Sequence, residues 1–293
     1  MAAAGSGLRR VSASERGVSV ALDGPDLHLS GSRLRSALQA CLDGCEALGG
    51  VERYIHALRL KSEMFQEILL ERGVAAMERD DFAALCAFMA TVRRRVAPDL
   101  EGEGFTQMRL SLQALISNLD EPATVDQRIE QFCLAFPQDR GHRWVRDLAA
   151  EVLHNLDPER YPLMARWVWD RAANTGALRE IWFAENVDHL TLEIEDHYPT
   201  FLMLRRELAV FLSDSGFFRD MPFYVDLLLA QVYAEYICAQ GGSYLRADFS
   251  SPEDPMQHTR RMLGLDGVKA GSSRLRMKSI DGAALVLADE QEG

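Results

Sequence analysis

Residues 185–201 of the chain, ENVDHLTLEIEDHYPTF, carry metal-ligand side chains at every fourth position. These are Glu185, His189, Glu193 and His197. On a helix, side chains four residues apart face the same way, so two carboxylates and two imidazoles would form one column. Iron, manganese and zinc accept this mixture of ligands. One hypothesis is therefore a non-haem metal-dependent enzyme that uses His and carboxylate ligands.

The apolar residues of the same stretch follow a different period. Leu190, Leu192 and Ile194 alternate with polar residues, and strict alternation is typical of a half-buried strand. The pattern therefore favours a strand over residues 188–195. Residues four apart in a strand are separated by about 13 Å, against about 6 Å on a helix, so the four ligands could not all bind one ion.

An aspartate–histidine pair remains at each end of the predicted strand, Asp188–His189 and Asp196–His197. An aspartate beside a histidine can orient the imidazole for general acid/base chemistry. The alternative is local, with Asp188 closing a turn and Asp196 or His197 capping a helix that starts near Pro199. The sequence favours the local alternative.

A second pair of potential ligands lies in AAEVLHNL, where Glu151 and His154 have the Glu-x-x-His spacing of di-iron helical bundles. Such bundles use the motif twice, and this chain has one copy. A metal site would therefore need distant residues to converge, with His154, His189 and His197 around one point.

Tryptophans gather around an arginine in the middle of the chain. Arg166, Trp167 and Trp169 lie close to Trp182 in sequence. Arginine and tryptophan are enriched at the centres of protein interfaces, so these four residues are the predicted partner-binding surface. The competing interpretation is a bulky corner of the core.

Composition narrows the class of protein. The 293 residues carry a formal net charge of −12, which argues against a general affinity for nucleic acid or anionic membrane. No window approaches the run of about 18 apolar residues that a transmembrane helix needs. Five cysteines, an odd number, fit reduced thiols in a cytoplasmic protein.

Helical periodicity dominates the middle of the chain. It predicts helices from Ser32 and Val51, over residues 80–95, 105–119, 124–136, 142–156, 159–174 and 178–186, and from Pro199 and Met221. The helix from Met221 is apolar nearly all round and is expected to be the most buried. Arg93, Arg94 and Arg95 are expected to interact with the carboxyl end of the helix over 80–95.

Strand signals gather at the termini, in GVSVALDGPDLHLSGS and SRLRMKSIDGAALVLAD. The predicted fold is mainly α (α+β), a single multi-helix domain with a small peripheral β-sheet or hairpins from the termini and residues 188–195. Residues 1–16 are expected to be a disordered leader and 17–264 the helical domain with an N-terminal β-hairpin. Residues 265–293 would form a C-terminal linker and β-hairpin.

Two fragments, DHLTLEI and MPFYVDLL, resemble pieces of the helical chaperones that mature molybdenum redox enzymes. They account for 15 of the 293 residues, and no residue role is transferred from them.

The function that these observations favour is a non-catalytic cytosolic accessory protein. It would be a helical scaffold that binds another protein in its assembly, maturation or regulation and needs no cofactor, and self-association is left open. The alternative is the metal-dependent enzyme with ligands among Glu151, His154, Glu185, His189 and His197. A regulator that binds a small molecule between its helices ranks below both.

Overall fold

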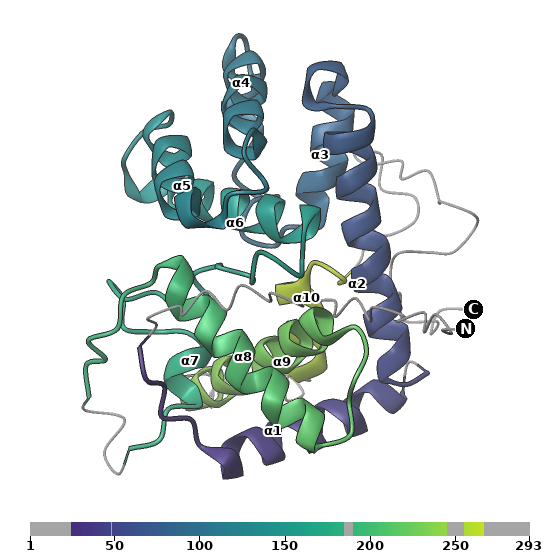
Figure 1. Ribbon diagram of the computed structural model, residues 1–293, viewed down its shortest axis with the longest axis vertical. Helices are drawn as coiled ribbons and strands as arrows, with labels where there is room; N and C mark the ends of the chain where they lie inside the picture. The colour runs from purple at the N-terminus through teal and green to yellow at the C-terminus, as the bar shows by residue number, and fades with distance from the viewer. Residues whose placement is uncertain (1–24, 48, 185–189, 245–254, 267–293) are drawn as a thin grey trace, which may run out of the picture.

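Helices make up most of the computed structural model, which describes residues 25–47, 49–184, 190–244 and 255–266. Ten α-helices lie in these ranges (Figure 1), which confirms the prediction of a mainly α chain. In chain order they are α1 (Gly31–Glu46), α2 (Val51–Gln66), α3 (Arg79–Ala87), α4 (Gly104–Ile116), α5 (Val125–Leu134), α6 (Trp144–Leu156), α7 (Ala177–Glu180), α8 (Tyr198–Asp214), α9 (Met221–Tyr244) and α10 (Pro255–Leu263).

The apolar helix α9 lies at the centre of the helices that form the lower half of the molecule in Figure 1. It packs against α1, α2, α7, α8 and α10, and all residues from 222 to 232 are buried. A helix with neighbours on every side needs an apolar surface all round. The helix is central, as predicted, but it is not the most buried one: residues 239 and 240 are exposed, whereas in α6 (Trp144–Leu156) every residue except Arg146 is buried.

Helix α6 is the central helix of the upper half, where α3, α4 and α5 lie around it (Figure 1). All its residues except Arg146 are buried, and it packs against α2, α4 and α5. Because α2 also packs against α9, it connects the two halves. Polar side chains on α6 are therefore enclosed, and each needs a partner inside the protein.

The predicted strands are absent from the part of the chain that the structure describes, which holds only isolated bridges. Residues 1–24 and 267–293, with most of the terminal hairpin signals, lie outside it. The described end of the first signal pairs instead with the segment after α7. Leu29 bridges Trp182, and the Phe183 amide donates to the His28 carbonyl at 2.7 Å.

Residues 190–196 form an irregular segment rather than the predicted strand. Its burial follows the predicted alternation in part: Leu192 and Ile194 are buried, while Leu190 is 40% exposed. Side chains supply the hydrogen bonds that a neighbouring strand would give. Asn174 donates to the Leu190 carbonyl and accepts from the Leu192 amide, both at 3.1 Å.

The predicted helix over 159–174 is wrong, since this segment consists of turns and irregular chain. Pro162 has no amide hydrogen and disfavours helix in the residue before it. Side chains of α6 then bind the freed backbone: the Tyr161 carbonyl lies 2.9 Å from His154 Nδ1, and the Arg166 amide donates to Asp147 at 3.1 Å. Tertiary contacts outweigh the helical pattern here.

Among the helices of the described residues, none combines the length and hydropathy that crossing a bilayer would require.

Candidate functional site: an arginine-lined pocket

His154, a predicted metal ligand, is enclosed in a hydrogen-bonded pair between α6 and α9. Its Nε2 lies 2.8 Å from Asp226 Oδ2, and its Nδ1 lies 2.9 Å from the Tyr161 carbonyl. Both ring nitrogens are therefore occupied by protein groups. Burial alone would lower the pKa of His154, but Asp226, the Tyr161 carbonyl and Glu151 together outweigh burial, and the pKa is raised.

Glu151, the other ligand predicted on α6, also has a protein partner. Its Oε2 lies 2.8 Å from Lys61 Nζ, and both side chains are 4% exposed. His197 is exposed at the N-cap of α8, while Glu185 and His189 lie outside the described residues. Among the residues described, no three His, Cys, Asp or Glu side chains gather in a way that could hold a metal ion.

The His154–Asp226 pair predicts a pH dependence of stability. A group whose pKa is raised by folding stabilises the fold fully below its unfolded pKa, about 6.5 for histidine, and loses this contribution as pH rises through the folded pKa. The free energy of unfolding, measured with urea, should therefore fall as the pH rises above about 6.5. His154→Asn should remove this fall in the free energy of unfolding above about pH 6.5, whereas the control His197→Asn, at an exposed position, should keep it. An identical profile in His154→Asn would contradict the assignment.

The predicted aromatic surface divides into buried rings and one accessible arginine. Trp167 and Trp169 are 5% and 0% exposed, and Trp182 is half-buried with an edge-on contact to His28 at 5.8 Å between ring centroids. Arg166 is half-buried. Of the four residues, Arg166 is the one that lines a pocket. Binding of a partner protein through these four residues stays a prediction.

Arg166 lines a pocket of about 510 Å³ together with four other arginines. The pocket lies between the turns that follow α3, the segment that enters α6 and the segment that leaves it. Its other described lining residues are Ala90 and Thr91, so none of the described residues that line it is a carboxylate. The five arginines are Arg94, Arg95, Arg140, Arg143 and Arg166.

Two of the five guanidinium groups form ion pairs with aspartates that are not among the described lining residues of the pocket. Arg166 contacts Asp147 at 2.7 Å, and Arg143 contacts Asp170 at 2.7 Å. These contacts hold the two side chains in place, and the pKa of Arg166 is raised because its hydrogen bonds to Asp147 outweigh the effect of burial, which would lower it.

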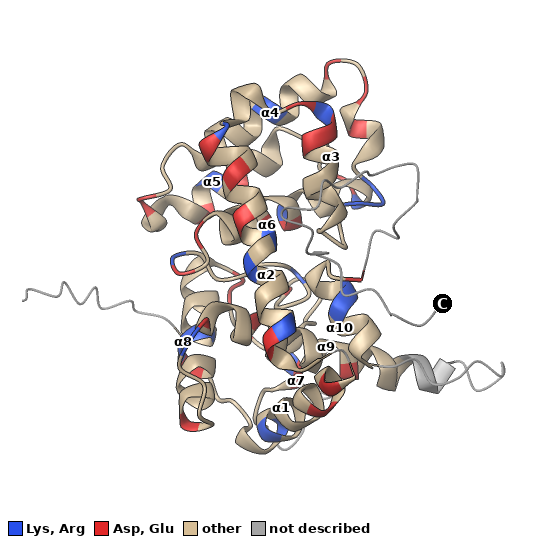
Figure 2. Cartoon of the chain, turned by 90° about the vertical axis from the view of Figure 1, so that its right-hand side faces the viewer, with Lys and Arg blue, Asp and Glu red and all other residues tan. Residues whose placement is uncertain are grey.

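The other three arginines, Arg94, Arg95 and Arg140, are exposed. Within the described part of the chain, none of the three has an ion pair or a side-chain hydrogen bond. Three uncompensated positive charges thus face one pocket of a chain whose net charge is −12. Elsewhere acidic and basic residues are interspersed along the helices (Figure 2).

An adjoining pocket of about 350 Å³ shares Arg143 and Arg166 with the arginine-lined pocket. It lies at the start of α6, whose first turn carries no side-chain cap. The amide groups at the start of a helix carry partial positive charge. This end of the site does include one carboxylate, Asp139, which accepts from the amides of Gly141 and His142.

The sequence contained the signal for this pocket, in Arg93–Arg95 and in the Arg140 and Arg143 pair. The expectation that the first run caps a helix holds for Arg93 alone, which donates to the Ala87 carbonyl at 3.4 Å and pairs with Asp266 at 2.5 Å. Helix α3 ends at Ala87 rather than near residue 95, and the side chains of Arg94 and Arg95 make no hydrogen bond to its carbonyl groups among the described residues.

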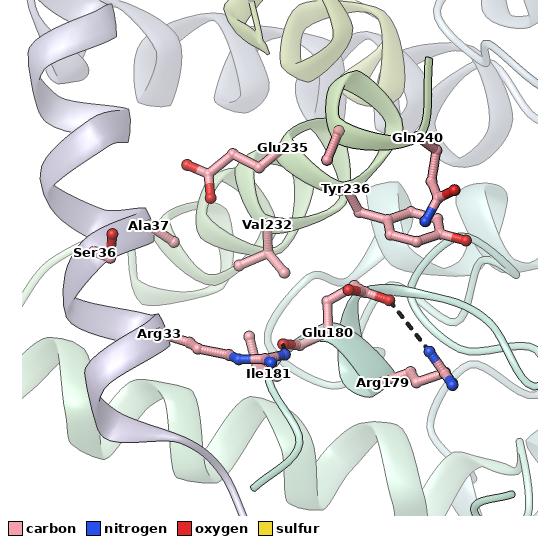
Figure 3. A pocket seen from close by; sticks show the side chains of 11 residues that line it. Arg33, Ser36, Ala37, Arg179, Glu180, Ile181, Val232, Glu235, Tyr236 and Gln240 are labelled. Atoms are coloured by element: carbon pink, nitrogen blue, oxygen red, sulfur yellow. Dashed lines mark hydrogen bonds and ion pairs between the residues drawn. The ribbon is translucent and has the colours of Figure 1, made fainter. Parts of the chain in front are cut away.

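A second pocket, of about 630 Å³, lies among α1, α7 and α9 (Figure 3). Glu235 and Tyr236 of α9 line one wall, opposite Arg33 of α1. Its charged groups already have protein partners: Arg33 donates to the Glu180 carbonyl at 2.5 Å, and Glu235 accepts from Gln231 at 3.0 Å. With both signs of charge present and paired, this pocket favours no ligand class.

The arrangement around Arg166 can bind oxyanions, because guanidinium groups donate paired hydrogen bonds to carboxylates and phosphates. Comparison with known proteins adds no ligand or activity to this geometry. No family model, no curated protein and no solved structure matches the chain.

Proposed function

We propose that this chain is a non-catalytic cytosolic accessory protein, a helical scaffold that binds another protein in its assembly, maturation or regulation. The arginine-lined pocket is its docking site. The observation that carries the proposal is the set of three arginines, Arg94, Arg95 and Arg140, that have no ion pair or side-chain hydrogen bond among the described residues of an otherwise acidic chain. Such a set keeps a fixed positive charge at some cost in mutual repulsion, which a negatively charged partner would offset.

A protein fits this pocket better than a nucleic acid does. A nucleic acid extends its phosphates well beyond one pocket, and on this chain they would meet a surface with a net charge of −12. A protein can place acidic groups in the pocket and neutral or basic groups around it. A metal-dependent activity has less support, because His154 and Glu151 are engaged with Asp226 and Lys61.

The test compares two triple variants that change the net charge equally. Arg94→Gln/Arg95→Gln/Arg140→Gln neutralises the pocket. The control Arg35→Gln/Arg206→Gln/Arg219→Gln neutralises exposed arginines that line neither pocket. In affinity capture at native expression levels, we expect wild type and control to recover the same partner and the pocket variant to lose at least nine-tenths of it.

Folding of the pocket variant is checked by urea unfolding. Its free energy of unfolding should stay within about 0.5 kcal/mol of wild type or rise, because the three side chains have no ion pair or hydrogen bond to lose among the described residues and repulsion is relieved. Equal recovery of the partner by a folded pocket variant would contradict the proposal. So would capture of the chain alone by wild type.

A further inference from the structure

We propose that the arginine-lined pocket binds an acidic peptide segment in an extended conformation. Its carboxylates would lie against Arg94, Arg95 and Arg140, and a neighbouring apolar side chain would lie in the adjoining pocket. The inference rests on the proposed function, whose partner would supply the segment.

The distribution of positive charge favours several carboxylates over one compact ion. The five guanidinium groups come from three separate parts of the chain, the turns after α3, the start of α6 and residue 166, and they line a volume of about 510 Å³. Pockets of roughly 300–1,000 Å³ hold ligands the size of a drug or a short peptide. A single small oxyanion could contact only part of this lining.

The adjoining pocket sets the direction of the segment. Pro137 and Val145 give it an apolar lining, and Asp139 adds a carboxylate there. That carboxylate would repel a second acidic side chain, and the three arginines of this pocket, Arg143, Arg146 and Arg166, are already ion-paired with Asp170, Asp196 and Asp147. The acidic part of the ligand therefore belongs beside Arg94, Arg95 and Arg140. An uncharged or apolar residue fits the end near Pro137.

The start of α6, at the junction of the two pockets, is placed to bind the backbone of the segment. Among the described residues it has no side-chain cap, and the amide groups at the start of a helix carry partial positive charge. Arg146, which lines the adjoining pocket, is engaged elsewhere: it donates to the Asp196 carbonyl at 2.6 Å and contacts the Asp196 carboxylate at 3.3 Å.

The experiment measures binding of two fluorescently labelled peptides to the full-length chain by anisotropy. One is a short peptide rich in Asp and Glu with a terminal Leu, and the other is its Asn/Gln counterpart. We expect the acidic peptide to bind wild type and the control variant Arg35→Gln/Arg206→Gln/Arg219→Gln equally. The pocket variant should bind at least tenfold more weakly, since one charge-assisted hydrogen bond is worth roughly tenfold in affinity.

Three results would overturn the inference: no binding of the acidic peptide, equal affinity for the Asn/Gln peptide, or an unchanged affinity in the pocket variant. Competition with inorganic phosphate separates the ligand sources. Displacement of the peptide by phosphate at a similar concentration would assign the pocket to a small oxyanion instead.

This result is distinguishable from failure of the proposed function. Peptide binding that depends on the pocket, together with partner capture that does not, would keep the acidic-segment site and remove the proposed docking role. Partner capture that depends on the pocket, without peptide binding, would keep the proposed docking role and remove the acidic-segment site.

Discussion

Lys61→Met is expected to lower the free energy of unfolding by about 3–5 kcal/mol. Lys61 Nζ lies 2.8 Å from Glu151 Oε2 in a region where both side chains are 4% exposed. Removing the ammonium group leaves a carboxylate in the interior with one weak donor, Asn155 Nδ2 at 3.4 Å. A buried charge that has lost its partner is far more costly than an exposed one.

The same substitution removes a contact to the C-terminal helix of the described chain. Lys61 also donates to the Leu263 carbonyl at the end of α10, at 3.1 Å. We therefore expect hydrogen exchange in α10 to accelerate in Lys61→Met more than in α4, which lies away from this contact.

Two variants complete the test of the Lys61–Glu151 pair. Lys61→Met/Glu151→Leu should recover most of the lost stability, since replacing a whole buried ion pair by apolar residues is often neutral or stabilising. The surface pair Arg171–Glu195, at 2.5 Å with 43% and 52% exposure, provides the control: Arg171→Met should cost less than about 1 kcal/mol. A similarly small loss for Lys61→Met in urea unfolding would contradict the buried-pair account.

Trp169→Ala is the second large effect, with an expected loss of about 3–5 kcal/mol in the free energy of unfolding. The side chain is 0% exposed, so its removal leaves a large cavity. Its Nε1 also donates to the Ile194 carbonyl at 3.1 Å, which attaches residues 190–196 to the core. A loss of this size is a large fraction of the 5–15 kcal/mol typical of a folded domain.

Trp169→Phe separates the two contributions. It keeps much of the apolar volume but loses the hydrogen bond, so it should cost less than Trp169→Ala while still accelerating hydrogen exchange at residues 190–196. Trp182→Ala, at a half-buried position, serves as the control and should cost less than Trp169→Ala. Equal losses for Trp169→Ala and Trp182→Ala would mean that Trp169 does not anchor the core.

The helices could be predicted from sequence where local pattern and tertiary packing agree. Helix α9 is apolar nearly all round and packs against five other helices, and α6 carries the long apolar stripe of a buried helix. The segment 159–174 shows the opposite case. Its periodicity is helical, but Pro162 and the side chains of His154 and Asp147 fix it as irregular chain.

Alternating apolar residues at 190–194 predicted which side chains are buried better than they predicted a strand. Leu192 and Ile194 face the interior, yet their backbone partners are side chains, such as Asn174 and Trp169. Alternation reports one buried face, and it carries no information on whether another strand lies alongside.

The arginine-lined pocket could be predicted only as separate parts. Arg94 and Arg95, Arg140 and Arg143, and Arg166 lie in three segments whose meeting depends on how α3 and α6 pack. The sequence points to Arg166 only through its tryptophan neighbours Trp167 and Trp169, whose rings lie in the core. Some of these arginines form an ion pair with an aspartate, as Arg143 does with Asp170. These pairs depend on tertiary contacts, which the periodicity of the sequence does not encode.

Site-specific photo-crosslinking tests whether a partner protein docks in the arginine-lined pocket. A photoreactive amino acid is placed at Thr91, which lines the pocket, and at Arg206, an exposed position on α8. We expect a covalent adduct with one partner from position 91 that disappears in Arg94→Gln/Arg95→Gln/Arg140→Gln, and no such adduct from position 206. The same adduct from both positions, or one from position 91 that survives loss of the three arginines, would contradict docking in this pocket.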